Sequence, residues 1–154
     1  MMQYVTAHFG RLDALILNAS GGLEIGADPG YAMRLNRDAQ RRLALLAMPL
    51  MPAGSRIVFV TSHQAHFYPH KAVAKGYGRV AASKRAGETA LYAMRSELDH
   101  AGIHLTVVSG DGTMGALPTV EGGFATKIVN AAVTPPNPST IVYAGAADYL
   151  MTVA

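Results

Sequence analysis

Short, nearly continuous apolar runs alternate with longer segments of helical periodicity along this chain, and this alternation constrains its fold more than any other feature. An apolar run without polar alternation suits a strand that is covered on both faces, as in a parallel sheet. Strands separated by helical segments are joined by right-handed crossovers. We therefore expect an α/β fold with about four parallel strands, at residues 12–17, 57–61, 103–108 and 140–143, and helices at 2–9, 28–48, 80–100 and 121–132.

Stop signals divide these segments. Gly10 ends the first expected helix, Pro49 and Pro52 end the second, and Gly102 ends the third. The residues between His63 and Lys75 are expected to form a loop without regular structure.

Composition limits the class of protein. The chain has 154 residues, of which 50% are hydrophobic and 15% are charged, so residues 1–154 are expected to form a single domain with a real core. It contains no cysteine, which removes disulfides, thiolate metal sites and a cysteine nucleophile. The net charge of +3 comes with few aromatic residues near the basic cluster at 71–85, so no nucleic-acid partner is expected. No signal peptide and no membrane-length apolar stretch is seen, which favours a cytoplasmic protein without a membrane partner.

Polar residues end the first three expected strands: Asn18, Ser62 and the segment 109–111. In parallel α/β sheets, chemistry lies at the carboxyl ends of the strands, so these residues are expected on one rim. A helix soon after Ser62 carries Lys84, with Tyr77 upstream of it. Serine, tyrosine and lysine side chains together can pass a proton to or from a substrate oxygen.

These motifs resemble the short-chain dehydrogenase/reductase family. The segment 17–21 (Leu-Asn-Ala-Ser-Gly) resembles its Asn-Asn-Ala-Gly turn, Val60-Thr61-Ser62 resembles the strand end with the catalytic serine, and Ser83-Lys84 resembles the end of its Tyr-x-x-x-Lys motif. Asn36 resembles the helix asparagine of the family's proton relay, and 108–110 resembles the turn near the nicotinamide.

The resemblance implies a Rossmann-like three-layer fold and hydride transfer between NAD or NADP and a small-molecule carbonyl or alcohol. The implied catalytic residues are Ser62 for the substrate oxygen, Tyr77 as acid/base, Lys84 to favour the ionised phenol and hold the ribose, and Asn36 to place a relay water. The implied cofactor-binding residues are Asn18, Ala19, Ser20, Lys84, Gly110 and Thr113. The two long helices, centred near Arg42 and Ala90, would form the interface of a homo-oligomer, such as a dimer.

Two departures from the family pattern stand out. The resemblance begins in the middle of the family's fold, so we expect an N-terminally truncated version without the Gly-rich phosphate-binding start. The position four before Lys84 is Val80, and Tyr77 lies seven before it. On a regular helix, Tyr77 would face the same way as Lys84 but lie about 10 Å from it along the helix axis. A tyrosine four residues before Lys84 would lie only about 6 Å from it. Gly78 could let the segment fold back and bring the phenol into place.

Plainer interpretations remain open for each candidate. Ser62 could simply cap a turn, Lys84 could be a solvated helix lysine, Asn36 could bond a neighbouring backbone, and Tyr77 could lie on the pocket rim or at an interface. Two weaker signals are set aside. The letters of 110–115 match a phosphate-binding fingerprint, but Pro118 interrupts the helix it needs. The histidines at 63, 66 and 70 lack a nearby carboxylate in sequence, so no metal is expected.

Two hypotheses follow. In the first, the chain is a short-chain dehydrogenase/reductase-like oxidoreductase, with the choice between NAD and NADP and the substrate left open. In the second, it is a non-catalytic member of the family that acts as an interaction or assembly subunit. The second gains support from the expected strand at 12–17, which would become a sheet edge with unpaired backbone groups that invite another chain.

Overall fold

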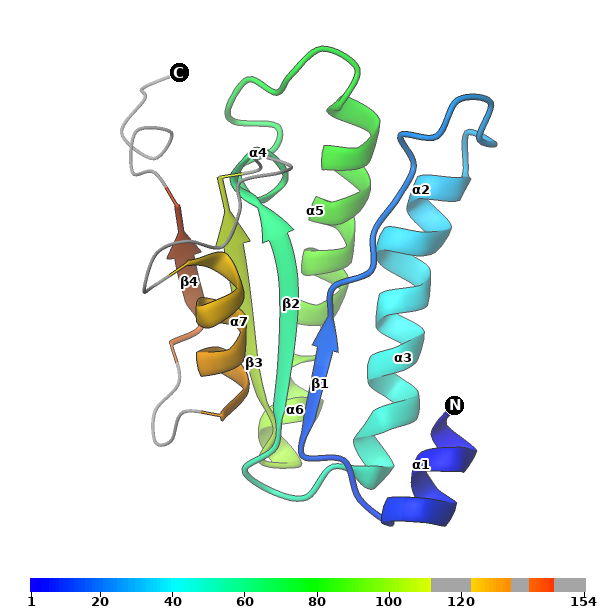
Figure 1. The fold of residues 1–154 in the computed structure, drawn as a ribbon, viewed down its shortest axis with the longest axis vertical. Helices are drawn as coiled ribbons and strands as arrows, with labels where there is room; N and C mark the ends of the chain where they lie inside the picture. Colours follow the sequence, from blue (N-terminus) through cyan, green and yellow to red (C-terminus); the bar gives the residue numbers. More distant parts are fainter. Residues whose placement is uncertain (112–122, 134–138, 146–154) are drawn as a thin grey trace.

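The computed structural model describes residues 1–111, 123–133 and 139–145, which leaves Thr113 and most of the 110–115 string outside the described residues. Its four strands lie in one parallel sheet in the order β1-β2-β3-β4, with helices on both faces (Figure 1). The strands are β1 (Ala14–Leu17), β2 (Arg56–Ser62), β3 (His104–Gly110) and β4 (Ile141–Ala144). This confirms the predicted Rossmann-like α/β fold and the expected position of each strand to within two residues.

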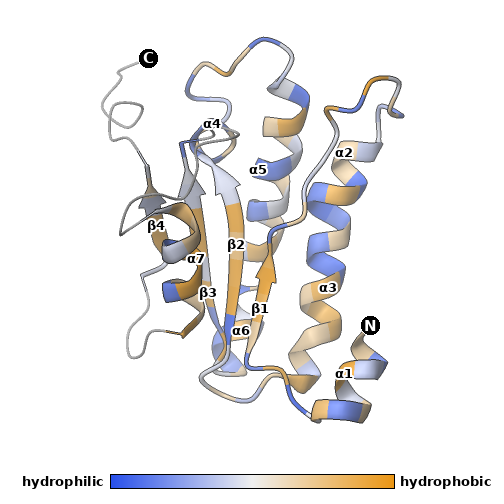
Figure 2. Ribbon diagram, viewed as in Figure 1, coloured by the Kyte–Doolittle hydropathy of each residue, from blue (hydrophilic) through white to orange (hydrophobic). Residues whose placement is uncertain are grey.

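β2 is the central element because every one of its residues is buried. It pairs with β1 on one side and with β3 on the other, over the whole seven-residue length of β3. An uninterrupted apolar run is what a strand covered on both faces requires. Figure 2 shows the apolar middle of β2 giving way to a more polar carboxyl end, where the candidate site residues begin.

Different helices cover the two faces of the sheet. On one face, α3 (Gln40–Ala47), α5 (Gly78–Tyr92) and α6 (Arg95–His100) enclose the larger core, which includes Ile57, Phe59 and Leu91. On the other face, α7 (Phe124–Val133) packs on a smaller cluster around Val58 and Val108. Alternate residues of β2 therefore feed the two cores, as the strand period demands.

The amino-terminal helix α1 (Met2–Phe9) ends at Gly10, whose φ of 71° is left-handed. Glycine adopts this conformation without the steric cost that a Cβ imposes, so the predicted stop signal is confirmed. No helix in the described parts of the chain is both long enough and apolar enough to cross a bilayer.

Three expected elements differ in detail. The helix expected at 28–48 begins at Tyr31 and is composite: α2 (Tyr31–Met33), the π-helical stretch η1 (Arg34–Ala39), α3, and the 3₁₀ turn η2 (Met48–Leu50). The helix expected at 80–100 is two helices, because the Met94 N–H turns back to the Leu91 carbonyl at 3.0 Å and tightens the chain between α5 and α6. The expected loop after β2 opens with a single helical turn, α4 (His63–His66).

Candidate active site

β1, β2 and β3 point the same way, and α4 lies at the carboxyl ends of β2 and β3 (Figure 1), while β1 ends opposite Phe59, three residues before the end of β2. Ser62 is the last residue of β2 and stands opposite Gly110 on β3. Asn18 directly follows β1. The structure thus brings the predicted polar strand ends to one rim, as the parallel topology requires.

Ser62 and Tyr77 are in direct contact at this rim. The Ser62 Oγ lies 3.0 Å from the Tyr77 phenolic oxygen, and either hydroxyl could be the donor. The Ser62 Oγ also accepts the Ala65 N–H at 3.2 Å, which makes Ser62 the N-cap of α4. Capping a turn and facing the tyrosine are therefore simultaneous properties of this serine, not alternatives.

Tyr77 reaches Ser62 from outside the helix. α5 begins at Gly78, and Tyr77 is the residue that precedes it. The Tyr77 N–H donates to the Ala74 carbonyl at 2.9 Å, and the Ala74 N–H donates to the Gln64 side-chain oxygen at 2.8 Å. Gln64 belongs to α4, so the segment that leaves α4 is tied back to it just before Tyr77. This return, and not a bend inside α5, sets the position of the phenol.

Val80 stands at the position where the family motif has tyrosine, and it is buried with 4% of its surface exposed. Its side chain lies near Gly22, because a Cβ added to that glycine would come within 3.4 Å of it. Val80 is therefore part of the packing between α5 and the turn after β1, and it has no group that can move a proton.

Lys84 lies on the second turn of α5 and is half-buried. Burial lowers the pKa of its ammonium below the ordinary value, because removal from water disfavours the charged form. Within residues 1–111, 123–133 and 139–145, its ammonium has no hydrogen-bond or ion-pair partner. Its three N–H donors are thus held in a partly desolvated setting.

Asn36, in η1, is buried and joins the turn after β1 to α5. Its side-chain Nδ2 donates to the Gly21 carbonyl and to the Ser83 Oγ, both at 2.9 Å, and its Oδ1 accepts the Gly21 N–H at 3.2 Å. Ser83 in turn donates to the Val80 carbonyl at 2.8 Å. The observed bonds of Asn36 are structural, and they fix the Gly21 backbone and Lys84's neighbour in one network.

The backbones of η1 and α5 approach closely at Gly87. A Cβ built on Gly87 would stand 2.1 Å from the Asn36 carbonyl oxygen, a distance that no real side chain tolerates. Glycine at this position therefore lets the helix that carries Lys84 press against the stretch that carries Asn36.

The turn at Asn18, Ala19 and Ser20 is exposed at the rim. The Gln40 Nε2 holds it by donating to the Ala19 carbonyl at 2.7 Å. Gly110 has a packing role as well, since a Cβ added there would come within 2.9 Å of the Phe124 ring.

Several residues that build this rim were not predicted. They act through side-chain hydrogen bonds to distant backbone or side chains, and they are Gln40, Gln64 and Ser83. Only Ser83 lay inside a quoted motif, and no spacing in the sequence marks the two glutamines.

Two of the three histidines singled out in the sequence, His63 and His66, lie on α4 and have side-chain partners. The His63 Nδ1 lies 2.7 Å from the Ser109 Oγ, and the His66 Nδ1 lies 2.8 Å from the Glu88 carboxylate. Among the described residues, no group of three or more histidine, cysteine, aspartate or glutamate side chains is arranged to hold a metal ion.

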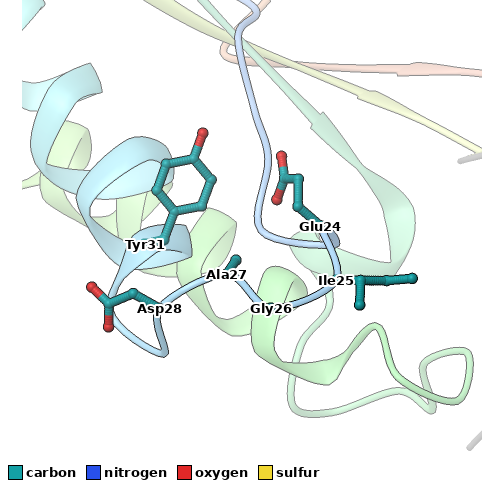
Figure 3. A pocket seen from close by; sticks show the side chains of 6 residues that line it. All are labelled: Glu24, Ile25, Gly26, Ala27, Asp28 and Tyr31. Carbon is teal, nitrogen blue, oxygen red and sulfur yellow. The ribbon is translucent and has the colours of Figure 1, made fainter.

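A shallow hollow of about 340 Å³ lies in the loop that leads to α2 (Figure 3), lined by Glu24, Ile25, Gly26, Ala27, Asp28 and Tyr31. Its two carboxylates are engaged locally: Glu24 accepts the Gly22 N–H at 2.6 Å, and Asp28 accepts the Gly30 N–H at 3.0 Å. The hollow is therefore a feature of a single loop, and none of Ser62, Tyr77 and Lys84 lines it.

Comparison with solved structures gives a consistent fold. No protein-family model and no curated protein sequence matches the chain. Solved structures do match: a short-chain dehydrogenase from Streptomyces avermitilis has a TM-score of 0.72 at 19% identity, over 97% of this chain and 66% of its own. BdcA in complex with NADPH has a TM-score of 0.58 at 28% identity, over 71% and 46%. In its fold, the chain is similar to short-chain dehydrogenases/reductases.

A further short-chain dehydrogenase, from Burkholderia cenocepacia J2315 in complex with NADP, has a TM-score of 0.59 at 27% identity, over 71% of this chain and 45% of its own. The chain thus spans from under half to about two thirds of the length of the structures it resembles.

Proposed function

We propose that this chain carries the proton-transfer half of a short-chain dehydrogenase/reductase site, for hydride transfer between NAD(H) or NADP(H) and a small carbonyl or alcohol substrate. The observation that carries the proposal is the 3.0 Å contact between the Ser62 Oγ and the Tyr77 phenol at the carboxyl rim of the sheet. Two hydroxyls in contact, with a half-buried lysine on the adjoining helix, suit the binding and protonation of one substrate oxygen.

The residues present fit the nicotinamide-ribose end of the cofactor. The Lys84 ammonium has free donors in a desolvated setting, and ribose hydroxyls are acceptors that would compensate its burial. The exposed turn at 18–20 lies at the same rim. A bound nicotinamide would supply or accept the hydride. The structures in complex with NADP or NADPH support a nicotinamide cofactor by resemblance and leave the choice between NAD and NADP open.

The chain's own residues would act on the substrate oxygen. During reduction of a carbonyl, Ser62 would donate a hydrogen bond to that oxygen, and Tyr77 would give up its phenolic proton to it. During oxidation of an alcohol, the proton would return to the phenolate. Lys84 would favour the phenolate through its positive charge, and Asn36 would hold the Gly21 turn and α5 in fixed relation.

Replacing Tyr77 tests this proposal. Tyr77→Phe removes one oxygen and is expected to lower kcat by at least about 100-fold, the usual contribution of an acid/base group, with cofactor Kd within about twofold of wild type. Tyr4→Phe is the matched control, because Tyr4 lies on α1, at the end of the sheet opposite the carboxyl ends of the strands (Figure 1), and is 60% exposed. Turnover of a panel of ketones is followed by the absorbance of NADPH and NADH. Full activity of Tyr77→Phe would remove Tyr77 from the mechanism.

The second hypothesis, a non-catalytic subunit, is favoured by one observation. β1 is one of the two edge strands of the described sheet, and Ile16 on it is 43% exposed. Such an edge could pair with another polypeptide. Titration of the chain with NADH and NADPH separates the hypotheses, since a chain that binds neither at millimolar concentration cannot be the oxidoreductase on its own.

We further propose that the protein is cytoplasmic and forms a homo-oligomer through α3 and α5. Leu45 and Leu46 on α3 are 38% and 49% exposed, which leaves apolar surface for a second copy. Light scattering after gel filtration checks this: a monomer at micromolar concentration would contradict it.

A further inference from the structure

A buried carboxylate on α5 is bonded to the helical turn that Ser62 caps. Glu88 is completely buried, and its Oε1 lies 2.8 Å from the His66 Nδ1, 2.7 Å from the Tyr92 hydroxyl and 2.9 Å from an Arg85 nitrogen. Its second oxygen, Oε2, has no hydrogen-bond partner among the described residues. A buried carboxylate normally has its charge compensated, and here three donors converge on one oxygen.

Two of these donors differ from the third in what they connect. Tyr92 and Arg85 lie on α5 itself, four residues after and three residues before Glu88, so their bonds stay within one helix. His66 lies at the end of α4 and is the donor that comes from another element. On its other side, the His66 Nε2 lies 3.3 Å from the Tyr143 hydroxyl on β4. His66 therefore joins α4 to α5 and to the sheet.

α4 needs such attachment, because four residues are far too few for a stable isolated helix. At its start, Ser62 accepts the Ala65 N–H and faces Tyr77. His63 is bonded to Ser109 on β3, and His66 is bonded to Glu88 on α5. If the end of the turn is released, the Ala65 N–H no longer has a fixed partner, and the Ser62 Oγ loses one of the two contacts that orient it.

We propose that the buried His66–Glu88 pair is an anchor that positions Ser62 by holding α4 in its helical turn. The anchor rests on the proposed function only for its effect on catalysis; its effect on the structure of α4 stands without it. His66 and Glu88 are positioning residues in this proposal, and neither contacts the substrate.

Hydrogen exchange of the Ala65 amide tests the anchor directly. His66→Leu removes the bond between elements and is expected to speed Ala65 exchange at least about tenfold, the effect of losing one hydrogen bond to a charged group. Tyr92→Phe is the matched control: it removes a donor to the same oxygen from within α5, so it should lower Tm while changing Ala65 exchange by less than about twofold. The Phe59 amide in β2 reports global opening in each variant.

A rescue variant separates positioning from general destabilisation. His66→Asn keeps an N–H donor at the same number of bonds from the backbone as the His66 Nδ1, and it should restore most of the Ala65 protection. If His66→Leu does not fold, Glu88→Leu takes its place as the variant that breaks the anchor, and its Ala65 exchange is compared with that of His66→Asn. Equal Ala65 exchange in Tyr92→Phe and the anchor-breaking variant, or no change in either, would overturn the proposal.

The catalytic arm is kept separate. In active protein, His66→Leu should lower kcat with cofactor Kd unchanged, and His66→Asn should recover it. If the wild-type chain shows no turnover, the proposed function fails, while the exchange experiment still decides whether the anchor exists.

Discussion

The contact between α5 and η1 at Gly87 can be tested by a single methyl group. In Gly87→Ala, the new Cβ would stand 2.1 Å from the Asn36 carbonyl oxygen and 3.1 Å from its carbonyl carbon. Both atoms are backbone, so the clash cannot be relieved by rotating a side chain, and α5 and η1 must separate. Overpacking of a well-packed contact costs about 3 kcal/mol at the upper end of the usual range.

A favourable effect opposes this cost. Alanine is preferred to glycine inside a helix by about 1 kcal/mol. The steric term is larger, so the net loss is about 2 kcal/mol, which corresponds to a fall in Tm of about 4–8 °C for a domain of this size. The same movement should separate the Asn36 side chain from Ser83, which lies one turn earlier on α5.

Gly78→Ala is the matched control on the same helix. Gly78 is the first residue of α5, and a Cβ added there meets only a Val73 methyl at 3.9 Å, an ordinary contact. Gly78→Ala should therefore leave Tm unchanged or raise it slightly. Thermal unfolding followed by circular dichroism measures both variants. A Tm for Gly87→Ala equal to or above that of Gly78→Ala would refute the close approach of the two backbones.

Two further predictions concern buried charge. Lys84→Met should raise Tm by about 2–4 °C at neutral pH, because it removes a desolvated ammonium that costs on the order of 1 kcal/mol. Under the proposed function, the same variant should abolish turnover. Burial lowers the pKa of Lys84 below 10.5, so the stability of the wild type should rise as the pH approaches 10.5. The difference in Tm between Lys84→Met and the wild type should therefore shrink. A difference in Tm that stays constant with pH would argue against the desolvation of Lys84. Burial alone would raise the pKa of Glu88, but hydrogen bonds from His66 and Tyr92 outweigh it and hold the pKa below the ordinary 4.5. The stabilisation is therefore present above pH 4.5 and is lost as pH falls through the lower folded-state pKa, so the deficit of Glu88→Gln in urea unfolding should be largest at neutral pH and should vanish in acid.

The strands could be read from the sequence because burial on both faces leaves an unbroken apolar run. β2 illustrates this, since each of its residues is buried. The rim followed from parallel topology, and Gly10 was readable because left-handed backbone favours glycine. These features depend on local composition and on general rules of chain connection.

The details of the site depend on contacts between distant residues, which the sequence does not display. The Gln64 side-chain oxygen accepts the Ala74 N–H, and this bond sets the position of Tyr77. Nothing in the ten-residue spacing between Gln64 and Ala74 predicts the bond. The break between α5 and α6 lies in a continuous helical pattern and is made by one tightened turn at Met94. Nothing in the sequence around Glu88 predicts its complete burial or its bond to His66 on α4.

The π-helical stretch at Arg34–Ala39 holds one consequence for comparing this chain with others. A π-turn is an α-helix with one residue added, and the wider turn takes up that residue locally. A relative with ordinary α winding here would therefore carry one residue fewer, while the turns on either side kept their faces. Any alignment of relatives should be allowed a one-residue gap within this segment, or the residues before it will be paired one position out of register.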